Sequence, residues 1–186
     1  MKFTLHYRGP LKANRGARDK HLLRRYFHEQ LGLLWDQAPL SDYHEYLSER
    51  EKEGEISLLY PIGNFKFIPL VSSRLHMIAE LDLTLLRPGP PGNLIVQSGD
   101  IDNRLKTLLD ALKIPKEPTA LAADEAPLQN ETPFFCLLED DSLITAISVT
   151  TDRLLQKTVD PNEVLLLIHV TTRVTRAIWG NSGLGS

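Results

Sequence analysis

The sequence has little cysteine and no long apolar run. Cys136 is the only cysteine among 186 residues, so no disulfide can form within the chain. Its neighbours from Phe134 to Leu138 are apolar, which favours a buried, inert thiol over a nucleophile or redox centre. The chain contains no run of about 18 apolar residues, which a membrane-spanning helix would need. The N-terminus alternates like a strand, unlike a signal peptide, so we expect a cytoplasmic protein with no membrane partner.

Several familiar kinds of functional site are also missing. The 6 histidines show no paired spacing typical of metal ligands, and no glycine-rich phosphate loop follows a predicted strand. A sugar-nucleotide transferase that bridges its metal with aspartates is disfavoured, because the chain lacks the length and a visible nucleotide-binding portion. The carboxylates and the basic residues therefore remain as the candidate functional groups.

The composition fits one globular domain. With 42% apolar and 24% charged residues, a chain of 186 residues buries a sizeable core. We expect an α+β fold, in which a mixed β-sheet packs against two main helices, over a single domain spanning 1–186. Segments 36–60 and 114–132 are expected to be insertions, and 177–186 a loose tail.

Hydrophobic periodicity predicts the individual elements. Alternation of apolar and polar residues predicts strands, and an i, i+3, i+4 spacing predicts helices. The expected strands cover 2–8, 65–71, 77–86, 134–138, 143–149 and 164–174. The expected helices cover 19–35 and a central segment beginning near residue 102. Their buried faces are expected to comprise Leu22, Leu23, Tyr26, Phe27, Leu31 and Leu34 in the first helix, and Leu105, Leu108, Leu109 and Leu112 in the second.

Charge is distributed unevenly along the chain. The formal net charge of -3 hides an excess of basic residues between Met1 and Trp35 and an acidic stretch from Asp36 to Glu55. A positive N-terminal face opposite an acidic site is compatible with a polyanionic substrate. Solvated helix faces give the same pattern, so this structural interpretation stays open.

Two aspartates stand where the central helix is expected to begin. The stretch Gly-Asp-Ile-Asp-Asn-Arg-Leu-Lys-Thr-Leu-Leu-Asp from Gly99 to Asp110 contains Asp100 and Asp102. If both precede the helix in extended chain, they point to one side with Cα atoms roughly 6 to 7 Å apart, and a divalent cation could bridge them. Asp102 or Asn103 is also expected to cap the first helical turn.

A second acidic pair, Asp140 and Asp141, falls in the connection between two predicted strands. Like charges held close raise each other's pKa and are tolerated mainly when a cation neutralises them. Mg²⁺ prefers such oxygen ligands and can activate a water for attack on phosphorus. Lys106, four residues after Asp102, is placed to stabilise phosphate charge.

Each of these residues also has a structural interpretation. Asp102 can be a helix cap, and Asp140 and Asp141 can form a polar turn. Lys106 can be the middle of an ion-pair ladder with Asp102 and Asp110, which stabilises a helix by roughly 0.2–0.5 kcal/mol per pair. Taken singly, each structural interpretation is favoured over the catalytic one.

Several segments together resemble the RusA family of Holliday junction resolvases. In that family a first strand ends in Gly-Pro and leads into a basic segment, as Tyr-Arg-Gly-Pro-Leu-Lys-Ala-Asn-Arg from Tyr7 does here. A strand ending in Arg-Pro precedes the acidic motif, as Leu-Asp-Leu-Thr-Leu-Leu-Arg-Pro from Leu81 does here. The first aspartate pair, the lysine four residues on, and the double aspartate before an alternating strand all match by position.

The resemblance implies a RusA-like homodimeric endonuclease that uses Mg²⁺, or Mn²⁺, to cut branched DNA such as a four-way junction in recombination and repair. The implied catalytic residues are Asp100, Asp102, Lys106, Asp140 and Asp141, with Asp100, Asp102 and Asp141 as metal ligands. The implied DNA contacts are Lys12, Arg15, Arg18 and Lys20. The long connection from Asp110 to Asp140 and the overall acidity depart from the family's pattern. A catalytically inactive DNA-structure binding protein of the same fold is therefore the alternative.

Overall fold

The chain is an α+β protein with mixed β-sheets. The computed structural model describes residues 1–13, 15–49, 55–89, 101–156, 160 and 162–184. Its α-helices are α1 (Ala17–Trp35) and α2 (Ile101–Leu112). None of the helices in these ranges is both long and apolar enough to cross a membrane.

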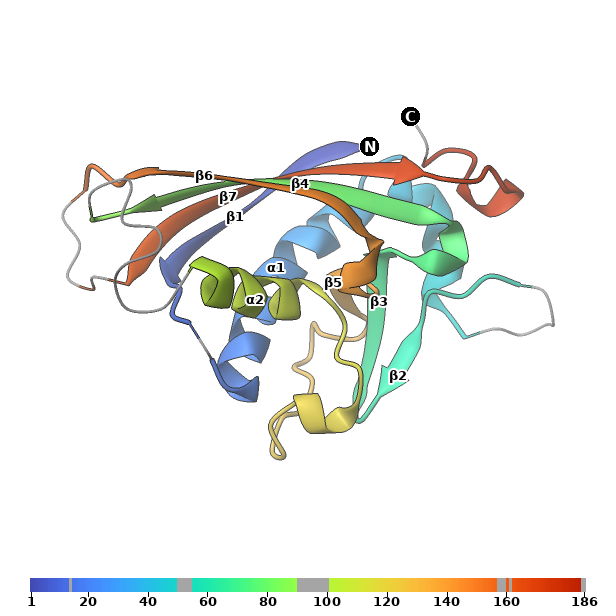
Figure 1. Ribbon diagram of the computed structural model, residues 1–186. Coiled ribbons are helices and arrows are strands. Elements are labelled where there is room, and N and C mark those ends of the chain that lie inside the picture. The colour runs from blue at the N-terminus through green and yellow to red at the C-terminus, as the bar shows by residue number, and fades with distance from the viewer. Residues whose placement is uncertain (14, 50–54, 90–100, 157–159, 161, 185–186) are drawn as a thin grey trace.

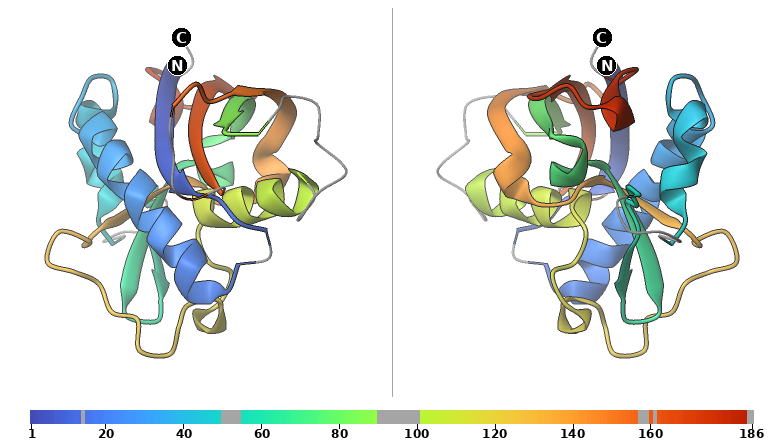
Figure 2. Two further views of the ribbon diagram at one scale, coloured as in Figure 1. Left: turned by 90° about the vertical axis from the view of Figure 1, so that its left-hand side faces the viewer. Right: turned by 90° about the vertical axis from the view of Figure 1, so that its right-hand side faces the viewer.

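The larger sheet contains β1 (Lys2–Pro10), β7 (Glu163–Val174), β4 (Met77–Arg87) and β6 (Ile144–Arg153), in that spatial order. β7 pairs antiparallel with both β1 and β4, whereas β4 and β6 are parallel. Figure 1 shows these strands running across one side of the molecule, with both helices beneath them. Figure 2 shows α1 and α2 crossing under the curved sheet.

The smaller sheet contains β2 (Tyr60–Ile62), β3 (Phe65–Val71) and β5 (Phe134–Leu138). β2 is antiparallel to β3, and β3 is parallel to β5. The prediction of a single mixed sheet is therefore wrong, because the strands form two sheets. β3 and β5 are almost continuously buried, which is typical of strands covered on both faces, and they pack beside α1 rather than join the larger sheet.

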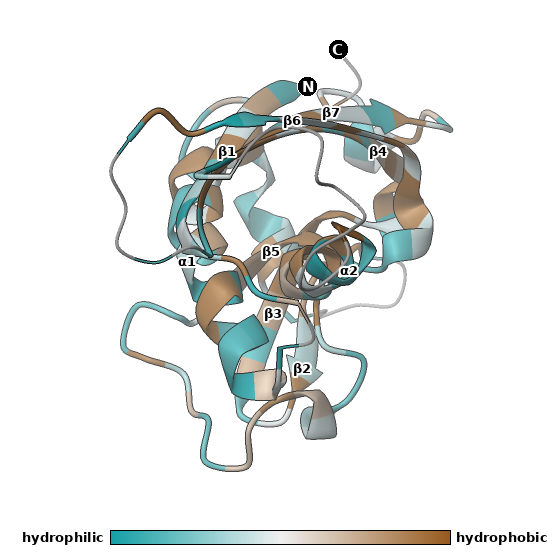
Figure 3. Cartoon of the chain, turned by 60° about the vertical axis from the view of Figure 1, so that its left-hand side comes forward, coloured by the Kyte–Doolittle hydropathy of each residue, from teal (hydrophilic) through white to brown (hydrophobic). Residues whose placement is uncertain are grey.

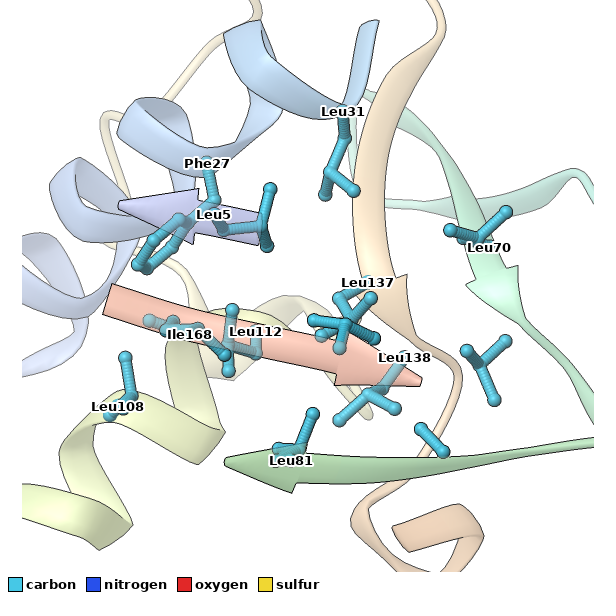
Figure 4. Packing of buried hydrophobic residues seen from close by; sticks show 14 of the residues in the cluster. Leu5, Phe27, Leu31, Leu70, Leu81, Leu108, Leu112, Leu137, Leu138 and Ile168 are labelled. Atoms are coloured by element: carbon cyan, nitrogen blue, oxygen red, sulfur yellow. The ribbon is translucent and has the colours of Figure 1, made fainter. Parts of the chain in front are cut away.

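The core lies between the larger sheet, the two helices and β5. The alternation expected along β4 is confirmed, because Met77, Ala79, Leu81, Leu83 and Leu85 are all buried. Figure 4 shows side chains from α1, α2, β4 and β5 meeting in this space, among them Phe27, Leu112, Leu81 and Leu137. Figure 3 shows apolar and polar residues alternating along the strands of the larger sheet.

Helix α1 buries part of the face expected, since Leu23, Phe27 and Leu31 are buried as predicted. Leu22 is 55% exposed and Tyr26 is 36% exposed, so the prediction that both are core residues is wrong. Three polar side chains occupy part of the buried stripe. Arg24 and His28 find hydrogen-bond partners outside α1, whereas His21 Nδ1 pairs with Arg24 of the same helix at 3.0 Å. The buried residues of α1 are His21, Leu23, Arg24, Phe27, His28, Leu31 and Trp35.

The segments expected to be insertions and a tail also contact the core. Between 36 and 60, the 3₁₀ helix Leu40–Leu47 buries Leu40 and Tyr46. The stretch after α2 is tied to α1, where Arg25 Nε lies 2.6 Å from a carboxylate oxygen of Glu131. In the tail, the side chain of Asn181 is buried and its amide nitrogen donates to the carbonyl of Leu75 at 2.7 Å. The described part of the tail is thus anchored at Asn181, while Trp179 in the same segment is 98% exposed.

Candidate functional site

The first turns of α2 carry the acidic motif. The helix begins at Ile101, so Asp102 lies inside its first turn and is not the cap that we expected at Asp102 or Asn103. Asp100, the first predicted metal ligand, lies outside the described residues. Asp102 and Lys106 are both exposed and stand one turn apart. The face of α2 that packs into the protein comprises Thr107, Leu108, Ala111 and Leu112.

The ion-pair ladder along α2 does not form. Asp110 instead binds Lys20 of α1 at 2.6 Å and Lys113 at 3.3 Å. Burial alone would raise the pKa of Asp110, but hydrogen bonds and charge from these two lysines lower it below the usual value. No ion pair involves Asp102 or Lys106 within the described ranges. Both side chains are therefore available to a ligand.

Asp140 and Asp141 lie between β5 and β6, as the sequence indicated. The carboxylate of Asp140 accepts a hydrogen bond from the backbone N–H of Ser142 at 3.0 Å and caps the 3₁₀ helix Asp141–Leu143. This N–H, then the Ser142 side chain and Lys116, lower the pKa of Asp140 well below its usual value. The polar-turn interpretation of Asp140 is confirmed.

Asp141 is held by a lysine at the C-terminal end of α2. The ammonium of Lys113 lies 2.6 Å from Asp141 Oδ2. Although burial opposes it, the hydrogen bond and charge of Asp141 raise the pKa of Lys113. This ion pair joins the segment that follows β5 to the end of α2.

Asp102 and the second acidic pair, Asp140 and Asp141, therefore lie near opposite ends of α2. With a rise of about 1.5 Å per residue, Asp102 is roughly 12 Å along the helix axis from Asp110, which shares Lys113 with Asp141. Among the residues that the structure describes, no three or more His, Cys, Asp or Glu side chains form a group suited to a metal ion. The described coordinates do not bring Asp102 together with Asp140 and Asp141.

The predicted DNA contacts differ in how their charges are used. The guanidinium of Arg18 lies 2.6 Å from Asp124, and the ammonium of Lys20 lies 2.6 Å from Asp110. Both cations are thus paired with carboxylates of the same chain. Lys12 is exposed, and Arg15 forms a longer contact of 3.3 Å with Asp19 while donating to the carbonyl of Pro10 at 3.0 Å.

One hydrogen bond brings the basic segment after β1 to the acidic motif. Arg104 of α2 donates from Nη1 to the carbonyl of Leu11 at 2.8 Å, and Lys12 is the next residue along the chain. Figure 1 shows the end of β1 beside the start of α2. A pocket of about 320 Å³ opens nearby, lined in part by Tyr7, Arg15, Tyr26 and Thr107.

Two arginines, Arg24 and Arg87, were not predicted from the sequence as candidate functional residues. Arg24 is buried in α1 and donates to the carbonyls of Asp110 and Lys113 at 2.8 and 3.1 Å, so it binds the C-terminal end of α2. Arg87 was noted only as part of the Arg-Pro match. Its sequence signal is that it continues the buried alternation Leu81, Leu83, Leu85 of β4 with a charged side chain.

Comparisons with known proteins assign no family to this chain. No protein-family model, curated protein or solved structure matches it. Any functional assignment rests on the chain's own residues.

Proposed function

We propose that this chain is a cytoplasmic, RusA-like, homodimeric endonuclease that hydrolyses phosphodiester bonds in branched DNA with Mg²⁺ or Mn²⁺. The observation that carries the proposal is the hydrogen bond from Arg104 to Leu11. It ties the carbonyl that precedes Lys12 to α2, the helix whose first turn bears the exposed carboxylate of Asp102, and this supports a shared site for the two segments. A polyanion bound by the basic segment and by α2 would meet a carboxylate that can hold a cation and an ammonium group that can neutralise charge on a phosphate.

In this proposal Asp102 and the preceding Asp100 hold the cation through carboxylate oxygens. Their chemistry fits Mg²⁺, which is commonly bound by one or two carboxylates together with phosphate oxygens and water. When bound, the ion activates a water and polarises the scissile phosphate. Lys106, one turn after Asp102, neutralises negative charge that develops on the phosphate oxygens, while Lys12 and Arg15 hold the neighbouring phosphates.

Asp140 and Asp141 have a conditional part in the proposal. Their carboxylates are engaged by Lys116 at 3.1 Å and Lys113 at 2.6 Å. They contribute to hydrolysis only if DNA or metal binding releases them from these lysines. Replacing Lys113 with Gln would then increase cleavage by making Asp141 available.

The second candidate function is a DNA-structure binding protein that does not cleave. The engagement of Asp140 and Asp141 by lysines favours it, because a cation shared between both acidic pairs requires their carboxylates to be free. Under this function the basic segment matters and the acidic residues do not.

A cleavage assay with labelled four-way junction, linear duplex and flap, with and without Mg²⁺, tests the proposal. We expect metal-dependent nicking of the branched substrates, reduced by about 10²-fold or more in Asp102→Asn while junction binding survives. The matched control is Asp36→Asn, which makes the same change at an exposed aspartate just beyond α1.

The other outcomes separate the candidates. Junction binding without cleavage under any metal would establish the binding protein instead. Cleavage of linear duplex alone would exclude branched DNA as the substrate while leaving a nuclease. Absence of both binding and cleavage would reject both candidates.

A further inference from the structure

We propose that Arg87, Arg104 and Arg153 form a phosphate-binding site where β4 and β6 end near the start of α2, and that its ligand is a phosphate group of nucleic acid. The inference deepens the proposed function, on which its choice of ligand rests, by adding contacts distinct from Lys12 and Arg15. In Figure 1, β4 and β6 end on the side of the molecule toward which the first turn of α2 also points.

Arg87 is the central residue of the cluster. It follows Leu81, Leu83 and Leu85 in the alternation of β4, so its side chain leaves the strand on the face that covers the helices. The Nε and Nη2 atoms of Arg87 are buried without a hydrogen-bond partner. Buried polar groups are nearly always hydrogen-bonded, and an unpaired buried cation is costly. These two nitrogen atoms of Arg87 therefore lack the hydrogen-bond acceptor that buried polar groups normally have.

Arg104 brings a second positive charge to the same place. Burial, and then the positive charge of Arg87, lower the pKa of Arg104. The hydrogen bond of Arg104 to the carbonyl of Leu11 supplies no negative charge. Within the described ranges, neither arginine forms an ion pair with a carboxylate.

Arg153 adds a third arginine from the neighbouring strand. It lies opposite Arg87 in the parallel register of β4 and β6, and residues aligned in this way point to the same face of a sheet about 4.8 Å apart. The backbone N–H of Leu154 donates to the carbonyl of Arg87 at 2.8 Å, which holds the two strand ends together. Arg153 is exposed, so the cluster opens to solvent on this side.

In the part of the chain that the structure describes, several other arginines pair with carboxylates, unlike those of the cluster. Arg18 and Arg25 each contact a carboxylate at 2.6 Å, which satisfies their charge within the chain. Three neighbouring arginines without such a partner are explained by a bound anion. A phosphate accepts paired N–H donors from guanidinium groups, and the N-terminal end of α2 favours negative charge as well.

The test measures DNA affinity in Arg87→Gln, Arg104→Gln and Arg153→Gln. The control is Arg176→Gln, which removes an exposed arginine beyond the opposite end of β7. Fluorescence anisotropy of a labelled four-way junction and a single strand, in EDTA to prevent cleavage, is followed over a range of KCl concentrations. We expect each cluster variant to bind about 5- to 10-fold more weakly and to lower the salt slope by roughly 1. The control should stay within about twofold.

A stability measurement distinguishes ligand binding from a structural role. Because Arg87→Gln removes an unpaired buried charge, we expect its Tm to be unchanged or higher than that of the wild type. A lower Tm together with unchanged DNA affinity would overturn the proposal. Arg87→Lys, which keeps the charge but not the paired donors, should bind with intermediate affinity.

The source of the phosphate is tested separately. If inorganic phosphate raises the Tm of the wild type but not of Arg87→Gln, and DNA does not bind, the ligand is a small phosphate compound and the assignment to nucleic acid is overturned. Loss of junction binding in the cluster variants supports nucleic acid even if Asp102→Asn has no effect on cleavage. The two proposals can therefore fail independently.

Discussion

The ammonium of Lys113 lies 2.6 Å from Asp141 and 3.3 Å from Asp110, at the C-terminal end of α2. This contact joins α2 to the turn after β5 and holds Asp141 away from the end of the helix that bears Asp102. The ion pair is therefore both part of the fold and a constraint on the candidate chemistry.

The Lys113–Asp141 pair should stabilise the protein measurably. In a double-mutant cycle of Lys113→Gln and Asp141→Asn, we expect a coupling free energy of about 1 kcal/mol, because the Lys113 side chain is only 13% exposed. Urea denaturation provides the measurement. The same cycle on Lys66 and Glu49, whose side chains are 50% and 73% exposed, is the control and should give below about 0.3 kcal/mol. Equal coupling in both cycles would contradict the structural role of Lys113.

The connection after α2 should depend on a buried carboxylate. Glu131 is buried and accepts from Arg25 Nε at 2.6 Å and from the backbone N–H of Leu128 at 2.8 Å. Glu131→Gln leaves Arg25 with weaker partners, so we expect the free energy of unfolding to fall by about 2–3 kcal/mol.

The exposed pair between the same two parts of the chain is the control for Glu131. Arg18 and Asp124 also join α1 to this connection, but both side chains are well exposed. Asp124→Asn should leave the free energy of unfolding nearly unchanged in the same denaturation experiment. A similar loss in both variants would show that the buried pair has no special role.

Stability should decrease in mildly acidic solution because of His21. Burial, and then the charges of Arg24 and Arg25, lower the pKa of His21 from 6.5 to about 3. In the unfolded chain, His21 therefore binds a proton below about pH 6.5. In the folded chain, it does not bind this proton until about pH 3. The stability that neutral His21 contributes to the folded state is fully present above pH 6.5. As the pH falls from 6.5 toward 3, this stability declines by up to about 1.4 kcal/mol per pH unit. Burial lowers the pKa of His28 as well and acts in the same direction.

A histidine variant separates this contribution from that of the carboxylates. His21→Phe keeps a ring against Phe65 and Phe134, whose centroids lie 5.0 and 5.3 Å away. We expect the variant to lose less stability than the wild type between pH 6.5 and pH 4, as followed by thermal denaturation. His169→Gln, at an exposed position of β7, controls for the loss of a histidine. An unchanged slope in His21→Phe would assign the pH dependence to other groups.

The end of α2 should depend on the buried Arg24. Its guanidinium donates to the carbonyls of Asp110 and Lys113, which have no partners further along the helix. Arg24→Met preserves most of the side-chain volume but leaves these carbonyls unpaired, so we expect a loss of about 2–4 kcal/mol in urea denaturation. Arg173→Met, on the outer face of the larger sheet, should cost less than about 0.5 kcal/mol. Equal losses would mean that the contacts of Arg24 contribute little.

Apolar patterning alone predicted most elements, since the strands at 65–71 and 134–138 begin and end as expected. Alternation and helical spacing are local properties of the chain, so they can be recognised without tertiary structure. The face of α1 was not predictable in this way. Whether Arg24 and His28 are buried depends on a carbonyl of α2, on the carbonyl of Asn130 and on a backbone N–H of β5.

The sequence by itself determined where the acidic motifs, the basic segment and the apolar strands lie along the chain. Only the tertiary structure decided that Lys113 holds Asp141 near one end of α2, that Arg104 ties the basic segment to that helix, and that Arg87 lies opposite Arg153. The physical reason is that ion pairs and hydrogen bonds act over a few ångströms between residues far apart in the chain. Their partners are set by how the sheets and helices pack, and no local pattern encodes that arrangement.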